Sequence, residues 1–363
     1  MHCKRFAAAL MAAFCTLSIS SCGKKENENS NKEENATTEQ TSSAETTNDT
    51  EVTTAETTDD VKNGENEDAS ANILDYVTVD KATPAMWKVT DPETGNVLYM
   101  LGTMHMITED TFPLPDYIMN VYDKCDGVAV EVDTSEILGD MSKLQDFYSK
   151  LVYTDGTTVK DHISDETYEK LKKYMTDNYM YNEVMDSYTA GYWASQVEAV
   201  SVTSIKKVDV NGVDARFIEM AQKDSKEVIS IENIDIQVDA LTAASDELAD
   251  YMISGTIDKA LDMPTYTKEF AEEYDKWASG DIDALDFESE ADEELPSELE
   301  DDFAEYADIM LYNRNGGMAE KAEEFLKNGK NYFFMVGAAH FAGDKGVDDI
   351  LESKGYKVER VSA

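Results

Sequence analysis

Histidine and cysteine are both scarce in this chain of 363 residues, which contains four of each. Cys3 and Cys15 lie in an apolar N-terminal segment that ends near Cys22, so the rest of the chain keeps only Cys125. One thiol cannot form an intrachain disulfide, and the fold must therefore rest on its apolar core. We expect Cys125, at the end of a helical pattern, to pack as a small hydrophobic residue rather than to act as a nucleophile.

Positive charge is also scarce, with 31 Lys and Arg against 76 Asp and Glu and a net charge of -45. A phosphate backbone would be repelled over almost the whole surface, which argues against nucleic acid as a partner. Anionic lipid headgroups are a poor match for the same reason. Beyond the N-terminal segment, the sequence has no apolar run long enough for a transmembrane helix. Attachment to a membrane would therefore depend on a lipid.

The N-terminus, "MHCKRFAAALMAAFCTLSISSCGKK", has a basic start, a short apolar run and small residues before Cys22. This pattern is typical of a secretory signal. The residues from Ile19 to Cys22 resemble the bacterial lipobox, whose cleavage leaves a lipid-modified cysteine at the new N-terminus. We therefore expect residues 1–22 to be a lipoprotein signal peptide, and the mature protein to be lipid-anchored on the extracytoplasmic face of a bacterial membrane. An ordinary signal peptide with an incidental cysteine is the simpler alternative.

Residues 23–74 contain mainly Asn, Glu, Thr, Ser and Asp. Such a segment cannot bury enough apolar surface to offset its chain entropy, so we expect a disordered acidic linker. The remaining residues, 75–363, are long enough for a single large domain.

The order of elements in this domain indicates an α/β fold. A hairpin pattern over 85–102 is followed by a helical pattern and then by the apolar strand "GVAVEV" at 127–132, which predicts parallel strands. Helix and strand patterns follow at 212–223 and 227–231, and again from 314 to 361. We expect a central, mixed and mostly parallel sheet flanked by helices, with a helical cap formed by residues 137–205 and 240–312.

Four side chains with potential chemistry follow predicted strands. His105 and His340 each end a GxxH motif, in "LGTMHM" and "VGAAHF", while Glu131 and Glu232 end two other strands. Ligands gather at the carboxyl ends of parallel strands, and two imidazoles with one or two carboxylates make a recognisable site for a divalent metal. By contrast, His162 occurs in a polar loop.

The glycines of the two motifs suggest a local reason for this placement. We expect Gly102 and Gly337 to let the backbone turn tightly where each strand ends, so that the following histidine points into the site.

Together, the two GxxH motifs, the Glu of "VEVD", the "RN" pair at 314–315 and the "GDKG" turn resemble the TraB/GumN family, relatives of the Tiki proteases. The resemblance covers about residues 84–361. It implies a fold similar to the erythromycin-esterase/ChaN-like group and, as in the Tiki members, a metal-dependent peptidase that prefers manganese or cobalt. Carried over by motif, the site histidines are His105 and His340, the acidic residue is Glu131, and the arginine is Arg314.

The leading hypothesis is a surface-anchored, metal-dependent hydrolase that acts on a peptide or protein. His105, His340 and a carboxylate would hold manganese, cobalt or zinc. Either Glu131 or Glu232 would accept the proton of the attacking water, and the sequence does not apportion the two roles. Arg314 would steady the developing negative charge.

Further polar residues near these motifs have simpler structural explanations. Asn315 could hydrogen-bond in the site, although a helix N-cap is the simpler interpretation, and we expect Asp133 and Asp214 to be structural.

Two alternatives remain open at this point. One is a metal-free, esterase-like hydrolase in which His105 or His340 is the general base. The other is a non-catalytic lipoprotein that binds or sequesters a peptide. The sequence does not define the substrate or the oligomeric state.

Overall fold

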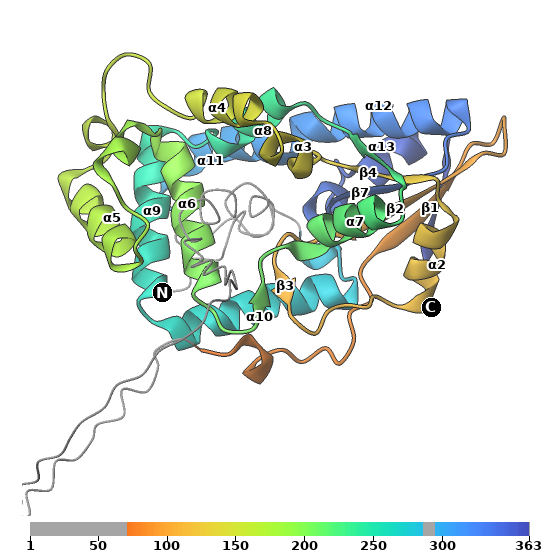
Figure 1. Ribbon diagram of the computed structural model, residues 1–363, viewed down its shortest axis with the longest axis horizontal. Coiled ribbons are helices and arrows are strands. Elements are labelled where there is room, and N and C mark those ends of the chain that lie inside the picture. The colour runs from red at the N-terminus through yellow and green to blue at the C-terminus, as the bar shows by residue number, and fades with distance from the viewer. Residues whose placement is uncertain (1–70, 286–294, 363) are drawn as a thin grey trace, which may run out of the picture.

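A six-stranded sheet forms one end of the molecule in the computed structural model, which describes residues 71–285 and 295–362 (Figure 1). Its strand order is β6-β4-β7-β2-β1-β8, and only β1 runs antiparallel to its neighbours. The predicted α/β fold with a mixed, mostly parallel sheet is confirmed. The strands are β1 (Met86–Thr90), β2 (Val97–Thr103), β4 (Gly127–Val130), β6 (Glu227–Ser230), β7 (Tyr332–Gly337) and β8 (Lys357–Val361), and a separate pair is β3 (Ile107–Thr108) with β5 (Val208–Asp209).

Strand β7 is buried along its whole length because helices cover both faces of the sheet. Phe333 meets Phe217 of α7 (Gly212–Lys223), with ring centroids 5.6 Å apart. The next residue, Phe334, points to the opposite face and meets Phe325 of α12 (Asn313–Asn328) at 6.4 Å. This continuous apolar strand is typical of a parallel sheet between two helical layers.

The two helices that sandwich β7 agree closely with the sequence pattern. The predicted helix at 212–223 coincides with α7, and the one predicted at about 314–328 begins one residue earlier as α12. A π-helical turn, η6 (Asp308–Tyr312), joins α11 (Glu300–Ala307) to α12. The remaining helices that pack at the sheet end are α2 (Asp116–Lys124), α3 (Thr134–Leu138) and α13 (Val347–Ser353).

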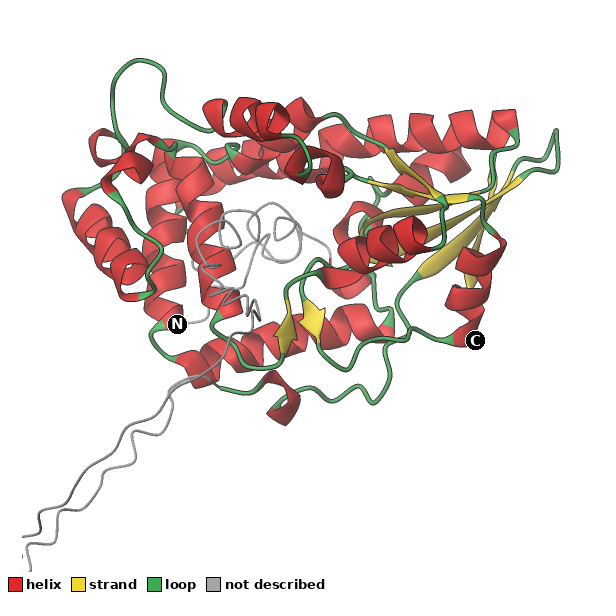
Figure 2. Cartoon of the chain, viewed as in Figure 1, coloured by secondary structure: helices red, strands yellow, loops and turns green. Residues whose placement is uncertain are grey.

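Helices alone build the other end of the molecule, as the colouring in Figure 2 shows. Ser164 caps α5 (Asp165–Asp177), since its side-chain oxygen accepts a hydrogen bond from Thr167 N. Trp193 is fully buried inside this end, whereas Trp277 lies against the sheet and donates from Nε1 to Gly102 O at 3.0 Å. The helices of this end are α4 (Met141–Ser149), α5, α6 (Ala190–Thr203), α8 (Ile234–Leu241), α9 (Asp246–Ala260) and α10 (Met263–Ser279).

The N-terminal predictions lie mostly outside the described residues, including the signal peptide, Cys22 and nearly all of the linker. Ile73, which lies within the predicted linker, is fully buried, and its N–H donates to Lys206 O at 3.1 Å. Within the described ranges, no helix combines the length and the apolar character that a membrane crossing requires.

Candidate functional site

The two GxxH histidines lie at the same edge of the sheet because their strands are neighbours. Strands β2 and β7 pair in parallel, with Thr103 opposite Gly337, so both chains leave the sheet at the same edge. His105 lies in the loop after β2, and His340 lies in the short helix η7 (Ala338–Phe341) that follows β7. Both side chains are buried.

The backbone at the glycines of these motifs does not have the left-handed conformation for which glycine is specially suited. Neither Gly102 nor Gly337 has a positive φ, and Gly337 has φ -50° and ψ 140°. Gly102 lies within β2, where a Cβ atom would sit 3.2 Å from Ala338 Cα. The requirement at Gly102 is therefore close packing against the backbone that leads to His340.

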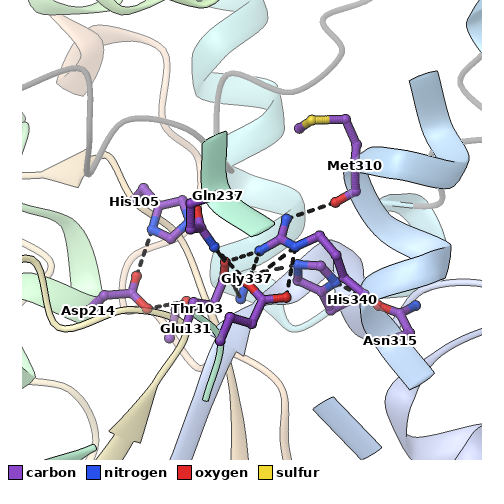
Figure 3. Close-up of polar contacts among 11 residues, drawn as sticks. Thr103, His105, Glu131, Asp214, Gln237, Met310, Asn315, Gly337 and His340 are labelled. Carbon is purple, nitrogen blue, oxygen red and sulfur yellow. Dashed lines mark hydrogen bonds and ion pairs between the residues drawn. The ribbon is translucent and has the colours of Figure 1, made fainter. Parts of the chain in front are cut away.

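Glu131 and Glu232 follow the paired strands β4 and β6, and Glu232 N donates to Glu131 O at 2.9 Å. Arg314, in the first turn of α12, lies between their carboxylates. Figure 3 shows the site, in which Glu131 lies near Gly337 and His340. The Nη2 atom of Arg314 is 2.6 Å from Glu131 Oε2 and 2.7 Å from Glu232 Oε2, while Nε is 2.9 Å from Glu232 Oε1. The guanidinium therefore joins two carboxylates from neighbouring strands.

Burial and charge separate the pKa values of these two acids. Burial raises the pKa of Glu232 above its ordinary value, although Arg314 opposes that shift. Burial also disfavours ionisation of Glu131, but the charge of Arg314 is the largest opposing effect, and with the N–H of Gly337 it helps to lower the pKa of Glu131 to about 2. Glu131 is thus held firmly as a carboxylate.

Arg314 is engaged mainly within the protein. In addition to the two carboxylates, it donates from Nη1 to Met310 O at 2.8 Å. These bonds restrict its availability to a substrate, and its part in stabilising negative charge stays a prediction.

His105 is oriented by Asp214, a residue of α7 that we had expected to be structural. His105 Nδ1 is 2.8 Å from Asp214 Oδ2, and Thr103 Oγ1 donates to Asp214 Oδ1 at 2.9 Å. Burial lowers the pKa of His105, but Asp214 outweighs this effect and the net shift is upward. The Nε2 atom of His105 is buried and has no hydrogen-bond partner.

His340 is oriented by Asn315, which lies inside α12 rather than at its N-cap, the position of Tyr312. His340 Nδ1 is 2.6 Å from Asn315 Oδ1, and Asn315 Nδ2 donates to Lys345 O at 2.8 Å. The Nε2 atom of His340 is also buried without a hydrogen bond, 3.7 Å from Glu131 Oε1. Burial and then Arg314 lower the pKa of His340 to about 3, so the imidazole is neutral.

His162, in contrast, has both ring nitrogens paired. Its Nδ1 atom contacts Asp246 Oδ2 and its Nε2 atom contacts Thr157 Oγ1, each at 2.7 Å, while the ring stacks on Tyr153. This contrast sets the two GxxH histidines apart from a structural histidine in the same protein.

Two other residues outside the site behave as expected. Asp133 caps α3 through Ser135 N. Burial raises the pKa of the Cys125 thiol to about 11, which suits a packed side chain.

The donor atoms match a divalent metal only in part. Two unpartnered imidazole nitrogens and a carboxylate are suitable ligands by chemical type. However, Glu131 Oε1 accepts from Gly337 N at 2.7 Å and Glu131 Oε2 accepts from Arg314. Over the described ranges, no group of three or more His, Cys, Asp or Glu side chains is arranged to hold an ion.

Sequence reasoning missed two polar side chains of the site. Thr103 anchors Asp214, and Gln237 of α8 donates to Glu232 Oε2 at 2.7 Å and more weakly to Glu131 Oε2 at 3.4 Å. Thr103 stands inside the first GxxH motif, which was a usable signal. Gln237 had none, because its contacts depend on how α8 folds back over the strand ends.

Comparison with known proteins shows which family and which individual proteins this chain resembles. The model of the TraB/PrgY/gumN family matches residues 85–360. A protein named metalloprotease TIKI2 from Xenopus tropicalis is 22% identical over 310 residues, which are 73% of this chain and 58% of that protein. Metalloprotease TIKI2 from Danio rerio is 22% identical over 318 residues, covering 76% of this chain and 60% of the relative.

A shorter match has higher identity. A metalloprotease TIKI homolog from Amphimedon queenslandica is 38% identical over 55 residues, or 15% of this chain and 11% of that protein. The chain thus spans 58% and 60% of the two TIKI2 relatives, and no solved structure matches it.

Proposed function

This chain belongs to the TraB/PrgY/gumN family, as its motifs predicted, and from that premise we propose that it is a metal-dependent peptidase acting on a peptide or protein. The observation that carries the proposal is the pair of buried Nε2 atoms, on His105 and His340, that have no hydrogen-bond partner. A buried polar atom without a partner costs about 1–3 kcal/mol, which a bound ligand would recover. The names of the TIKI relatives favour a metal as that ligand.

His105 and His340 would hold the ion, and Glu131 is the carboxylate that we assign as their companion because its Oε1 atom lies near His340 Nε2. Manganese, cobalt and zinc are the candidates. When bound, the ion would polarise a water molecule and a peptide carbonyl.

The charge of the site supports a divalent cation. With both histidines neutral, Glu131, Glu232 and Asp214 count as three negative charges when ionised and Arg314 as one positive charge, which leaves a net charge of -2. Since all four side chains are buried, this charge is poorly solvated, and a divalent ion would cancel it.

We assign different roles to the carboxylates of Glu131 and Glu232. Arg314 binds both carboxylates, but Glu131 also lies 3.7 Å from His340 Nε2, whereas the further partner of Glu232 is Gln237. We therefore assign Glu232 as the general base that accepts the proton of the attacking water. Arg314 holds both carboxylates in place.

Metal uptake by the full chain tests this function. Calorimetry with Mn²⁺, Co²⁺ and Zn²⁺ should show binding by the wild type and its loss in His105→Ala and His340→Ala, together with loss of peptide cleavage. His162→Ala is the matched control and should bind as the wild type does. The proposal is abandoned if the wild type takes up none of the three ions.

One observation favours a second candidate, a protein that binds a peptide without cleaving it. In the described part of the chain, Arg314 already engages both glutamates and no three-ligand cluster is formed. Capture of an intact peptide that survives the double substitution His105→Ala and His340→Ala would favour this candidate over the peptidase.

We also propose that the protein is anchored through a lipid on Cys22 at the extracytoplasmic face of the membrane. The lipobox-like residues before Cys22 support this proposal. Cys22→Ser should move the protein out of the membrane fraction after cell fractionation. An unchanged distribution would contradict lipid attachment at this cysteine.

A further inference from the structure

Both site histidines have the same hydrogen-bond pattern, in which Nδ1 is paired and Nε2 is left without a partner. We infer that Asp214 and Asn315 are positioning residues that hold the imidazoles as Nδ1–H tautomers, which leaves both Nε2 lone pairs free to bind a ligand. The use of these lone pairs for a metal rests on the proposed function. The assignment of the tautomers does not, because it follows from hydrogen-bonding chemistry alone.

At His105 the tautomer is fixed by the carboxylate of Asp214. An ionised carboxylate only accepts hydrogen bonds, so His105 Nδ1, at 2.8 Å, must be the donor. Thr103 Oγ1 donates to the other carboxylate oxygen and fixes its rotation. The backbone is fixed as well, because Val213 N donates to Met104 O at 2.9 Å. In the neutral imidazole, the lone pair therefore belongs to Nε2.

At His340 the tautomer is fixed by the side-chain amide of Asn315. Lys345 O can only accept, so the Asn315 atom that faces it must be the donor Nδ2. This places Asn315 Oδ1, an acceptor, 2.6 Å from His340 Nδ1, which must then carry the proton. Asn315 is completely buried, so solvent does not compete for either bond.

The two acceptor residues differ in charge, and the charged groups around their histidines differ as well. Asn315 is neutral, and its histidine lies next to Glu131 and Arg314. Asp214 can carry a negative charge, which opposes the effect of burial and raises the pKa of His105. A partner that accepts from one ring nitrogen and frees the other is the usual arrangement around metal-binding histidines.

The first test reads the tautomers without metal. Long-range ¹H–¹⁵N correlation spectra of the full chain, labelled with ¹⁵N-histidine and treated with chelator in alkaline buffer, should show Nδ1–H at His105 and His340. Single-histidine variants assign the signals. In Asp214→Ala and Asn315→Ala, the affected ring should become a mixture of tautomers.

The second test measures Zn²⁺ affinity of the same proteins. Asp214→Ala and Asn315→Ala should each bind about 10–100-fold more weakly than the wild type. Asp214→Asn retains an acceptor oxygen and should rescue both the tautomer and most of the affinity. Asp246→Ala removes the acceptor from His162 Nδ1 and should leave Zn²⁺ binding unchanged, which makes it the matched control.

The outcomes separate the inference from the proposed function. If the wild type binds no Zn²⁺, the metal-dependent function is excluded. The tautomer spectra alone then decide whether Asp214 and Asn315 position the histidines. An Nε2–H proton at either site histidine overturns the inference. It is also overturned if Asp214→Ala and Asn315→Ala, shown by near-UV circular dichroism to be folded, keep wild-type tautomers and affinity.

Discussion

At the scale of single residues, Arg314 is the group on which the charge balance of the site depends. It is buried, and its guanidinium binds Glu131 and Glu232 at the same time. A buried ion pair contributes little net stability, since removing both charges from water offsets their attraction. Removing only the cation is different, because two carboxylates would then remain buried beside each other.

We therefore predict that Arg314→Met lowers the free energy of unfolding by about 3–5 kcal/mol. The triple variant that adds Glu131→Gln and Glu232→Gln should recover much of this loss, since no buried charge is left unpaired. Urea denaturation of the metal-free proteins measures both effects. A single variant as stable as the wild type would show that the carboxylates are not both ionised.

The residue scale also shows how far sequence reasoning reached. His105 and His340 could be predicted because histidine is rare and both occur in the same short motif. Asp214 could not be assigned to His105, since the two are 109 positions apart and nothing local distinguishes this aspartate from others. The same holds for Arg314, whose two partners depend on side-chain directions rather than on spacing.

At the scale of elements, the beginning of α7 is packed directly on the loop that carries His105. Gly212, the first residue of this helix, has φ +62°, and a Cβ atom there would lie 2.2 Å from His105 O. Two requirements, a left-handed backbone and room for the loop, therefore meet at one position. Our sequence reasoning predicted the helix but not this contact.

We predict that Gly212→Ala costs more than the roughly 1–2 kcal/mol of a left-handed backbone alone and displaces His105. Gly156→Ala is the matched control, because Gly156 also has a positive φ, +88°, but faces open space. Denaturation measures the two losses, and the His105 imidazole signal in the NMR spectrum reports displacement. Equal losses in the two variants would argue against the close contact.

Elements that are formed locally were predictable, whereas their order in the sheet was not. The hairpin of β1 and β2 and the parallel direction of β2 and β4 follow from turn residues and strand spacing. Nothing in that reasoning indicates that β7 lies between β2 and β4. Strand order is decided by the packing of distant segments, such as Phe333 and Phe334 against α7 and α12.

At the scale of the whole molecule, negative charge dominates. With 76 acidic and 31 basic residues, like charges repel one another over most of the surface, and this repulsion opposes the compact state. Individual surface ion pairs such as Lys170 with Asp258 are worth at most about 1 kcal/mol each, so they offset only part of it.

We predict that raising NaCl from low to moderate concentration increases the melting temperature at pH 7, by about 2–4 °C for each 1 kcal/mol of repulsion that is screened. Differential scanning calorimetry measures the shift. The control is the same salt series near the isoelectric point of about 4.2, where the effect should disappear. A melting temperature that falls with salt at pH 7 would mean that attractive pairs outweigh the repulsion.

The central place of β7 also governs when the molecule becomes complete during its synthesis. A ribosome releases the chain N-terminus first, so β2, β4 and β6 are all made before the strand that must lie between β2 and β4. Pairing of such distant segments is slow, and here it cannot start until the C-terminal segment has emerged. A fragment that ends before Tyr332 lacks His340 and the strand that places it. The proposed activity would therefore be unavailable in nascent or prematurely terminated chains.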